Sequence, residues 1–160
     1  MEENLYEMNE SINSILGFSA YGKQYLSFTV EDEEYAFSIL KIREIIGMKK
    51  ITKVPNLPPY IKGVINLRGN IIHLIDIRER FNMSLRPYDK TTVVIIIETK
   101  DKLIGIIVDQ VKDVINIKEE DVQKPLEFSC NIEEEFLEGL SKVNDRLVVI
   151  LDVDKLLMKV

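Results

Sequence analysis

The sequence has little of the chemistry that enzymes and metal sites need. Its 160 residues include one cysteine, one histidine and no tryptophan. The lone Cys130 cannot form an internal disulfide, so a stabilising disulfide framework is excluded. The chain shows no glycine-rich phosphate loop, no cluster of metal ligands and no serine in a nucleophile-elbow context. We therefore expect no catalytic residue, no cofactor, no metal and no enzymatic activity.

Long apolar runs and basic clusters are also missing. The longest apolar stretches, such as 93–97, have the length of a strand and fall far short of the roughly 20 residues that span a membrane. No N-terminal stretch combines basic residues, an apolar run and a small-residue cleavage site. The net charge is −6 and the basic residues are scattered, which argues against nucleic acid as a partner. The expectation is a cytoplasmic protein without direct membrane insertion.

Two isolated residues and two acidic runs are the remaining candidates for chemistry. His73 lies in an apolar strand pattern, where a lone histidine is typical of a packed side chain rather than a base or ligand. Cys130, in the segment EFSCN, is interpreted as a bystander. The runs KEEDV and NIEEEF are typical of solvated helix starts, where negative charge suits the helix dipole.

Apolar residues alternate with a period of two over much of the chain, which predicts a mainly β protein. A hairpin is predicted across the turn EDEE. Further strands are predicted over 64–67, 71–75, 93–98, 103–108, 114–117, 140–143 and 147–151. Short helices are predicted after Asp76 and Asp152, whose carboxylates are suited to cap them, and around 132–136.

Residues 1–22 differ from the rest of the chain. Apolar residues recur there at helical spacing and predict a short amphipathic helix, followed by a link containing Gly17 and Gly22. The apolar positions are Leu5, Met8, Ile12, Ile15 and Leu16. A docked or frayed terminus is favoured over a partner-binding helix, and both interpretations stay open.

An internal repeat is the most informative feature. The stretch GVINLRGNIIHLIDIRERF (63–81) matches GLSKVNDRLVVILDVDKLL (139–157) without a gap, and ILKIREIIG (39–47) matches VDQVKDVIN (108–116). Two matches in the same order indicate that one small β unit occurs twice. About five short strands in each unit suit a small barrel. Because continuous apolar runs imply strands covered on both faces, we predict two barrels around a shared core, with a groove at their junction.

The segment VPNLPPYIKG (54–63) holds three of the five prolines. Because proline lacks an N–H and cannot join a central strand, this segment should cross the surface or the barrel seam in extended form. Its apolar side chains either close the barrel end, which is the favoured interpretation, or contact a partner directly.

Arg68 stands at a predicted tight turn in which Gly69 and Asn70 are expected to supply positive φ angles. The second repeat makes the equivalent turn with Asn144 and Asp145, so the arginine is an addition to the turn. It is either a solvated cation, with pairing worth roughly 0 to 1 kcal/mol, or a planar multi-donor group displayed for a partner. The sequence alone does not separate these two interpretations.

The run VPNLPPYIKGVINLRGNIIHLIDIRERF resembles the CheW family of chemotaxis coupling proteins. The segments EEYAFSILKIREII before it, and GIIVDQVKDVI and NDRLVVILDVDKLL after it, extend the likeness over about Lys23 to Leu157. The resemblance implies a CheW-like domain over residues 23–160, made of two intertwined SH3-like five-stranded β-barrels packed around a shared core, with short helices. It also implies a non-enzymatic adaptor that couples methyl-accepting chemoreceptors to the histidine kinase CheA.

The resemblance further implies where partners bind. The cytoplasmic tip of the receptor would lie along the groove between the barrels, and the barrel ends would contact the regulatory domain of CheA in membrane-associated receptor arrays. The family's partner-sensitive positions fall on Ile42, Glu44, Gly63, Arg68, Val111 and Val114. We also hypothesise that Glu44 pairs with Arg68 and orients it. His73 stands where the family often has proline, so a more regular strand is expected there.

Two alternatives remain at this stage. One is a CheW-like coupling domain from a paralogous, non-flagellar signalling pathway. The other is a nucleic-acid-binding small barrel, which would need a basic face with exposed aromatic residues and which the acidic balance disfavours.

Overall fold

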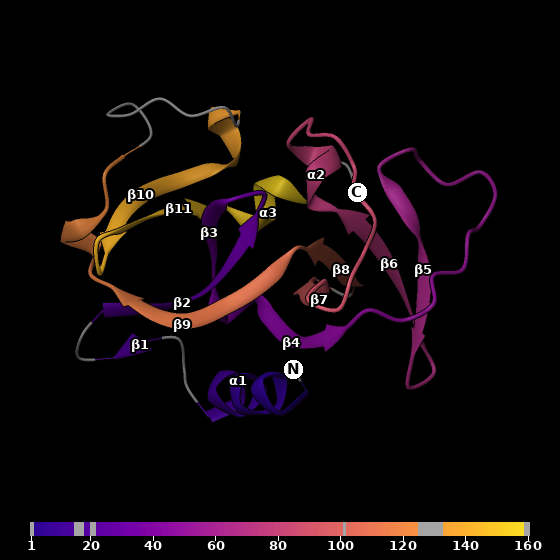
Figure 1. The fold of residues 1–160 in the computed structure, drawn as a ribbon, viewed down its shortest axis with the longest axis horizontal. Helices are drawn as coiled ribbons and strands as arrows, with labels where there is room; N and C mark the ends of the chain where they lie inside the picture. Colours follow the sequence, from indigo (N-terminus) through magenta and orange to yellow (C-terminus); the bar gives the residue numbers. More distant parts are fainter. Residues whose placement is uncertain (1, 15–17, 20–21, 101, 125–132, 159–160) are drawn as a thin grey trace.

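The computed structural model describes residues 2–14, 18–19, 22–100, 102–124 and 133–158, and is mainly β (Figure 1). Cys130, interpreted as a bystander, lies outside these residues, as do Ile15, Leu16 and Gly17 of the predicted N-terminal helix and link. The strands are β1 (Phe18–Ser19), β2 (Gly22–Val30), β3 (Glu33–Ser38), β4 (Ile42–Gly47), β5 (Ile61–Leu67), β6 (Asn70–Asp76), β7 (Val93–Thr99), β8 (Lys102–Val108), β9 (Gln110–Ile117), β10 (Leu137–Val143) and β11 (Arg146–Leu151). The helices and 3-10 turns are α1 (Glu2–Ser14), η1 (Ile39–Lys41), α2 (Ile77–Arg80), η2 (Glu119–Asp121), η4 (Glu134–Phe136) and α3 (Val153–Leu156).

The strands form two sheets, as expected for two small barrels. The first sheet has the order β1-β2-β3-β11-β10, and β9 also pairs with β2. The second sheet has the order β4-β7-β8-β6-β5. Each sheet contains one parallel pair, β3 with β11 and β6 with β8. The predicted fold class is confirmed, with the two-residue β1 as an addition to the five main strands of the first barrel.

The two sequence repeats exchange halves between the sheets. The first repeat runs from β2 to α2 and the second from β7 to α3. Strands β2 and β3 pair with β9 and β11 of the second repeat, whereas β7 and β8 pair with β4 and β6 of the first. The chain therefore crosses between the sheets twice, at η1 before β4 and at Asp109 before β9.

The main core lies between the sheets and takes side chains from both. Phe28 and Phe37 of the first sheet join Ile75 and Ile95 of the second in one buried cluster. Smaller clusters cover the other face of each sheet. For this reason neither face of β2 is exposed to solvent, although apolar and more polar residues alternate over 25–30. Even Ser27 is buried. A strand covered on both faces loses its polar side, as the apolar run of β7 had predicted.

Asp76 and Asp152 cap α2 and α3, as predicted. The Asp76 Oδ1 atom accepts a hydrogen bond from the Arg78 N–H at 2.9 Å, and the Asp152 Oδ1 atom accepts one from the Lys155 N–H at 3.1 Å. The other Asp76 oxygen accepts a hydrogen bond from the Tyr88 hydroxyl at 2.9 Å. Burial, followed by the Asp76 charge, raises the pKa of Tyr88, so this hydroxyl stays protonated.

A buried guanidinium fixes the crossover at Asp109. Arg78, whose side chain is 2% exposed, donates to both carboxylate oxygens of Asp109, at 2.7 and 3.3 Å. It also donates to the Glu31 carboxylate and, at 3.1 Å, to the Ser84 carbonyl. Burial lowers the pKa of Arg78, but hydrogen bonds and charges from Asp109 and Glu31 outweigh it and raise the pKa above its ordinary value. One side chain thus joins α2, the β2–β3 turn and the second crossover.

Removing the carboxylate of Asp109 is expected to destabilise the fold strongly. In Asp109→Ala the Arg78 charge stays buried without its main partner, which typically lowers the free energy of unfolding by about 3 to 5 kcal/mol. Urea unfolding measures the loss. The control is Glu98→Ala, which breaks an exposed ion pair with Arg43 and should cost less than about 1 kcal/mol. Equal losses in the two variants would contradict this role of Asp109.

Candidate partner-binding site

Arg68 lies at the tip of the β5–β6 hairpin with a left-handed backbone. Leu67 pairs with Asn70, so Arg68 and Gly69 form a two-residue turn with φ angles of 51° and 87°. The expectation that Asn70 supplies a positive φ is wrong, because Asn70 is the first residue of β6. Two positive φ angles match the primed turns that suit the twist of a hairpin, but a side chain such as that of Arg68 costs roughly 1 to 2 kcal/mol there. The second repeat places Asn144, which tolerates this conformation, at the equivalent position (φ 48°).

The hypothesised ion pair between Glu44 and Arg68 is present. The Arg68 Nη2 atom donates to Oε1 of Glu44. Glu44 belongs to β4 and Arg68 follows β5, the two end strands of the second sheet, so the contact forms where this barrel closes. The Arg68 side chain is 68% exposed and that of Glu44 is 21% exposed. An exposed pair of this kind adds little stability, and its main effect is to orient the guanidinium.

The other predicted positions on β4 and β9 lie close to the shared core. Ile42 is buried at the start of β4, and Val111 and Val114 of β9 are half-buried and pack against the same cluster. Helix α1 contacts both strands, and Figure 1 shows it running alongside β4, on the outside of the barrels. A hollow of about 450 Å³ lies between α1 and β9 and includes Val111 in its lining.

Gly63, predicted as a partner-sensitive position, is buried in β5. Its φ is 151°, and a Cβ atom there would lie 2.6 Å from the Thr52 carbonyl oxygen and 2.5 Å from a methyl of Ile51. This close approach arises because Thr52 and Val64 exchange two backbone hydrogen bonds of 2.9 Å. A side chain at position 63 would push the segment before β5 away from the barrel. Gly63 therefore fixes the shape of the barrel at the start of β5.

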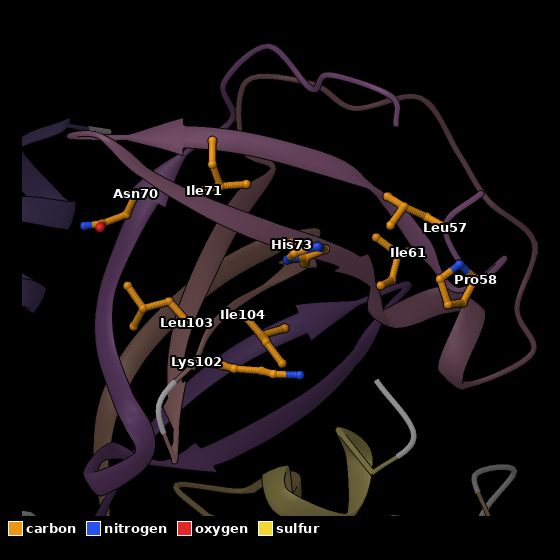
Figure 2. A pocket seen from close by; sticks show the side chains of 9 residues that line it. All are labelled: Leu57, Pro58, Ile61, Asn70, Ile71, His73, Lys102, Leu103 and Ile104. Carbon is orange, nitrogen blue, oxygen red and sulfur yellow. The ribbon is translucent and has the colours of Figure 1, made fainter. Parts of the chain in front are cut away.

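A second hollow, of about 520 Å³, lies beside β6 and β8 (Figure 2). It is lined by Leu57, Pro58, Ile61, Asn70, Ile71, His73, Lys102, Leu103 and Ile104. Figure 2 shows Leu57, Pro58 and Ile61 gathered at one end, Asn70 at the other and His73 near the middle. The proline-rich segment thus borders a surface hollow. His73 pairs in register with Val64 and Ile104, as a residue in a regular strand does.

Sequence reasoning missed one pair of surface residues. Ile71 is 58% exposed and Leu147 is 62% exposed, and they occupy equivalent positions just after the turn in the two repeats. Each begins the apolar run of a strand, so both were interpreted as strand interior. The repeat itself held the missing signal. In both copies this position is the first apolar residue after the hairpin turn, and the turn lies at the end of a barrel.

Within the described residues, no group of three or more His, Cys, Asp or Glu side chains is placed to hold a metal ion. None of the described helices is long and apolar enough to cross a membrane.

The strained backbone at Arg68 predicts how substitutions there change the free energy of unfolding. Replacing Arg68 with Asn should leave the free energy of unfolding unchanged or raise it by up to about 1 kcal/mol, because Asn tolerates the left-handed backbone better. Arg68→Val, with a β-branched side chain in the same conformation, should lower it by about 1 to 2 kcal/mol. Urea unfolding measures both. A loss above about 1 kcal/mol in Arg68→Asn would show that the arginine is there for stability.

Comparison with known proteins agrees with this architecture. A family model described as the CheW-like domain matches residues 24–160. "Chemotaxis protein CheW" of Klebsiella aerogenes is 39% identical over 144 residues, which cover 90% of this chain and 87% of that protein. "Chemotaxis protein CheW" of Helicobacter pylori is 37% identical over 136 residues, covering 85% of this chain and 82% of that protein.

A solved structure shows the same fold. The scaffolding protein TtCheW from Thermoanaerobacter tengcongensis superposes with a TM-score of 0.75 at 35% sequence identity, covering 82% of this chain and 89% of that chain. The family model spans both barrels, and the matching relatives extend over most of their own length. The chain therefore belongs to the CheW-like domain family.

Proposed function

We propose that this protein is a non-enzymatic adaptor that couples methyl-accepting chemoreceptors to the histidine kinase CheA on the cytoplasmic side of the membrane. The observation that carries the proposal is Arg68. The turn does not require an arginine, the backbone there is strained for one, and Glu44 orients an otherwise exposed guanidinium. Strain of this kind, at a residue whose one ion pair adds little stability, is typical of residues kept for recognition, and arginine is enriched at interfaces.

Two kinds of surface support contacts with two partners. Strands β4 and β9 both contact α1 and carry four of the six predicted partner residues, and this surface suits the helical tip of a receptor. The apolar side chains of Ile71 and Leu147 are exposed at the barrel ends, where the regulatory domain of CheA would dock. Because one molecule then makes several small contacts, assembly depends on their combination and each single contact is weak.

The proposal predicts that Arg68→Asn abolishes most kinase activation without unfolding the protein. In a mixture of receptor-containing membranes, CheA and this protein, autophosphorylation should fall at least about tenfold with the variant, the range expected when an interface arginine of this kind is lost. The matched control is Arg43→Gln, which removes an equally exposed arginine from an ion pair on β4 and should keep near wild-type activation.

Two outcomes would count against the proposal. If the wild-type protein failed to activate a cognate CheA in the presence of cognate receptors, the coupling function would be wrong. If wild type and Arg68→Asn activated equally, the coupling function would stand and the role given to Arg68 would be lost. The source organism's flagellar kinase and receptors, and those of any paralogous pathway, can be assayed separately. The set that this protein activates identifies its pathway.

A further inference from the structure

Helix α1 lies on the surface that carries the predicted receptor contacts. Its buried residues, Leu5 and Ile12, and the half-buried Met8 between them form one apolar stripe. This stripe faces β4 and β9, while Tyr6 and Glu10 on the other side of the helix are exposed. The surface between the barrels therefore already accepts an amphipathic helix, and here the helix belongs to the same chain.

Asn9 recognises the free edge of β4. Its Nδ2 atom donates to the Ile45 carbonyl oxygen at 3.0 Å, and its Oδ1 atom accepts from the Ile45 N–H at 2.9 Å. β4 is an end strand of the second sheet and pairs with β7 along one edge. The N–H and carbonyl groups of Ile45 that bind Asn9 lie on the opposite edge, where a group from outside the sheet can reach them. A single amide side chain satisfies both, in the way that a neighbouring strand would.

The contact made by α1 has the properties of a replaceable one. A helix of 13 residues is marginal on its own in water, so its order depends on what it packs against. The helix also fills the surface incompletely, because a hollow of about 450 Å³ remains between Leu5 and Met8 on one side and Val111 on the other. A partner helix with larger side chains would bury more apolar area at the same place.

We propose that α1 is an internal ligand of the receptor-binding surface: it occupies β4 and β9 in the free protein and must leave before a receptor helix docks there. The incoming helix replaces Leu5, Met8 and Ile12 with its own apolar stripe. It presents an Asn or Gln to Ile45 at the place of Asn9. This inference rests on the function proposed above, since it names a regulation of the same site. If α1 is docked nine-tenths of the time, the apparent affinity for the receptor is lowered about tenfold.

The test compares the full chain with an Asn9→Ala variant, using a soluble helical hairpin from the cytoplasmic tip of a chemoreceptor. Loosening α1 should tighten hairpin binding by about three- to tenfold, because less of the protein is in the occluded state. The control is Glu10→Gln, which changes an exposed residue next to Asn9 and should bind as wild type does. Affinity for the isolated regulatory domain of CheA should be equal in all three proteins.

Hydrogen exchange supplies a readout that does not depend on the receptor. The Ile45 amide should be protected in the wild type and exchange faster in Asn9→Ala, since Asn9 is its acceptor. With wild-type protein and saturating hairpin, amides of α1 should exchange faster while the Ile45 amide stays protected.

The outcomes separate the two proposals. Equal hairpin affinity in wild type and Asn9→Ala would overturn the inference and leave the adaptor function in place. Weaker binding by Asn9→Ala would also overturn it, by making α1 part of the receptor site. No hairpin binding by any of the three proteins would overturn the receptor function, and the inference with it.

Discussion

The fold depends on holding the chain at the two places where it crosses between the sheets. At the second crossover, Arg78 of α2 holds Asp109 through a buried, two-pronged contact and reaches the β2–β3 turn as well. At the first crossover the residue of α3 that is equivalent to Arg78 also forms an ion pair, although its partner is not at the position equivalent to Asp109, which is Leu40. Asp154 of α3 pairs with Lys41 of η1 at 2.9 Å, with both side chains well exposed. In both repeats the helix that ends the repeat therefore forms an ion pair near a crossover, once as a buried pair whose loss is costly and once as a weak surface pair.

The partner surface is a consequence of the same crossovers. Each crossover leads directly into the strand that carries predicted partner residues, β4 after η1 and β9 after Asp109. Because the repeats exchange halves, these strands belong to different sheets, and α1 contacts both of them. Because β4 is an end strand of its sheet, one of its edges is left for Asn9 to bind. For the same reason the Glu44 carboxylate can reach Arg68 beside the other end strand. The surface proposed for partner binding is thus formed by the strands at which the two barrels are joined.

Particular residues show how far the sequence reached into the site. The pairing of Glu44 with Arg68 was predicted and is present, although the two are far apart in the chain. The turn beside it was assigned one residue too late, because Gly69 and Asn70 are the usual positive-φ residues and the arginine takes a conformation its propensity disfavours. Asn9 was missed because it lies between two apolar positions of a helical pattern, and nothing in that pattern shows that the amide will meet a strand edge.

The sequence by itself determined most of the local elements, although β1 and β4 were not among the predicted strands. Period-two alternation, the capping aspartates and the repeat were enough to predict two small barrels. Each of these signals depends on the spacing of residues along the chain, which the geometry of strands and helices sets directly. Only the tertiary structure decided which half of each repeat joins which sheet, how Arg78 is buried and what covers β4. Strand exchange leaves every local pattern unchanged, because β6 and β11 carry matching apolar runs, 71–75 and 147–151. The choice is made by the packing of the whole core, where contacts distant in sequence outweigh local preference.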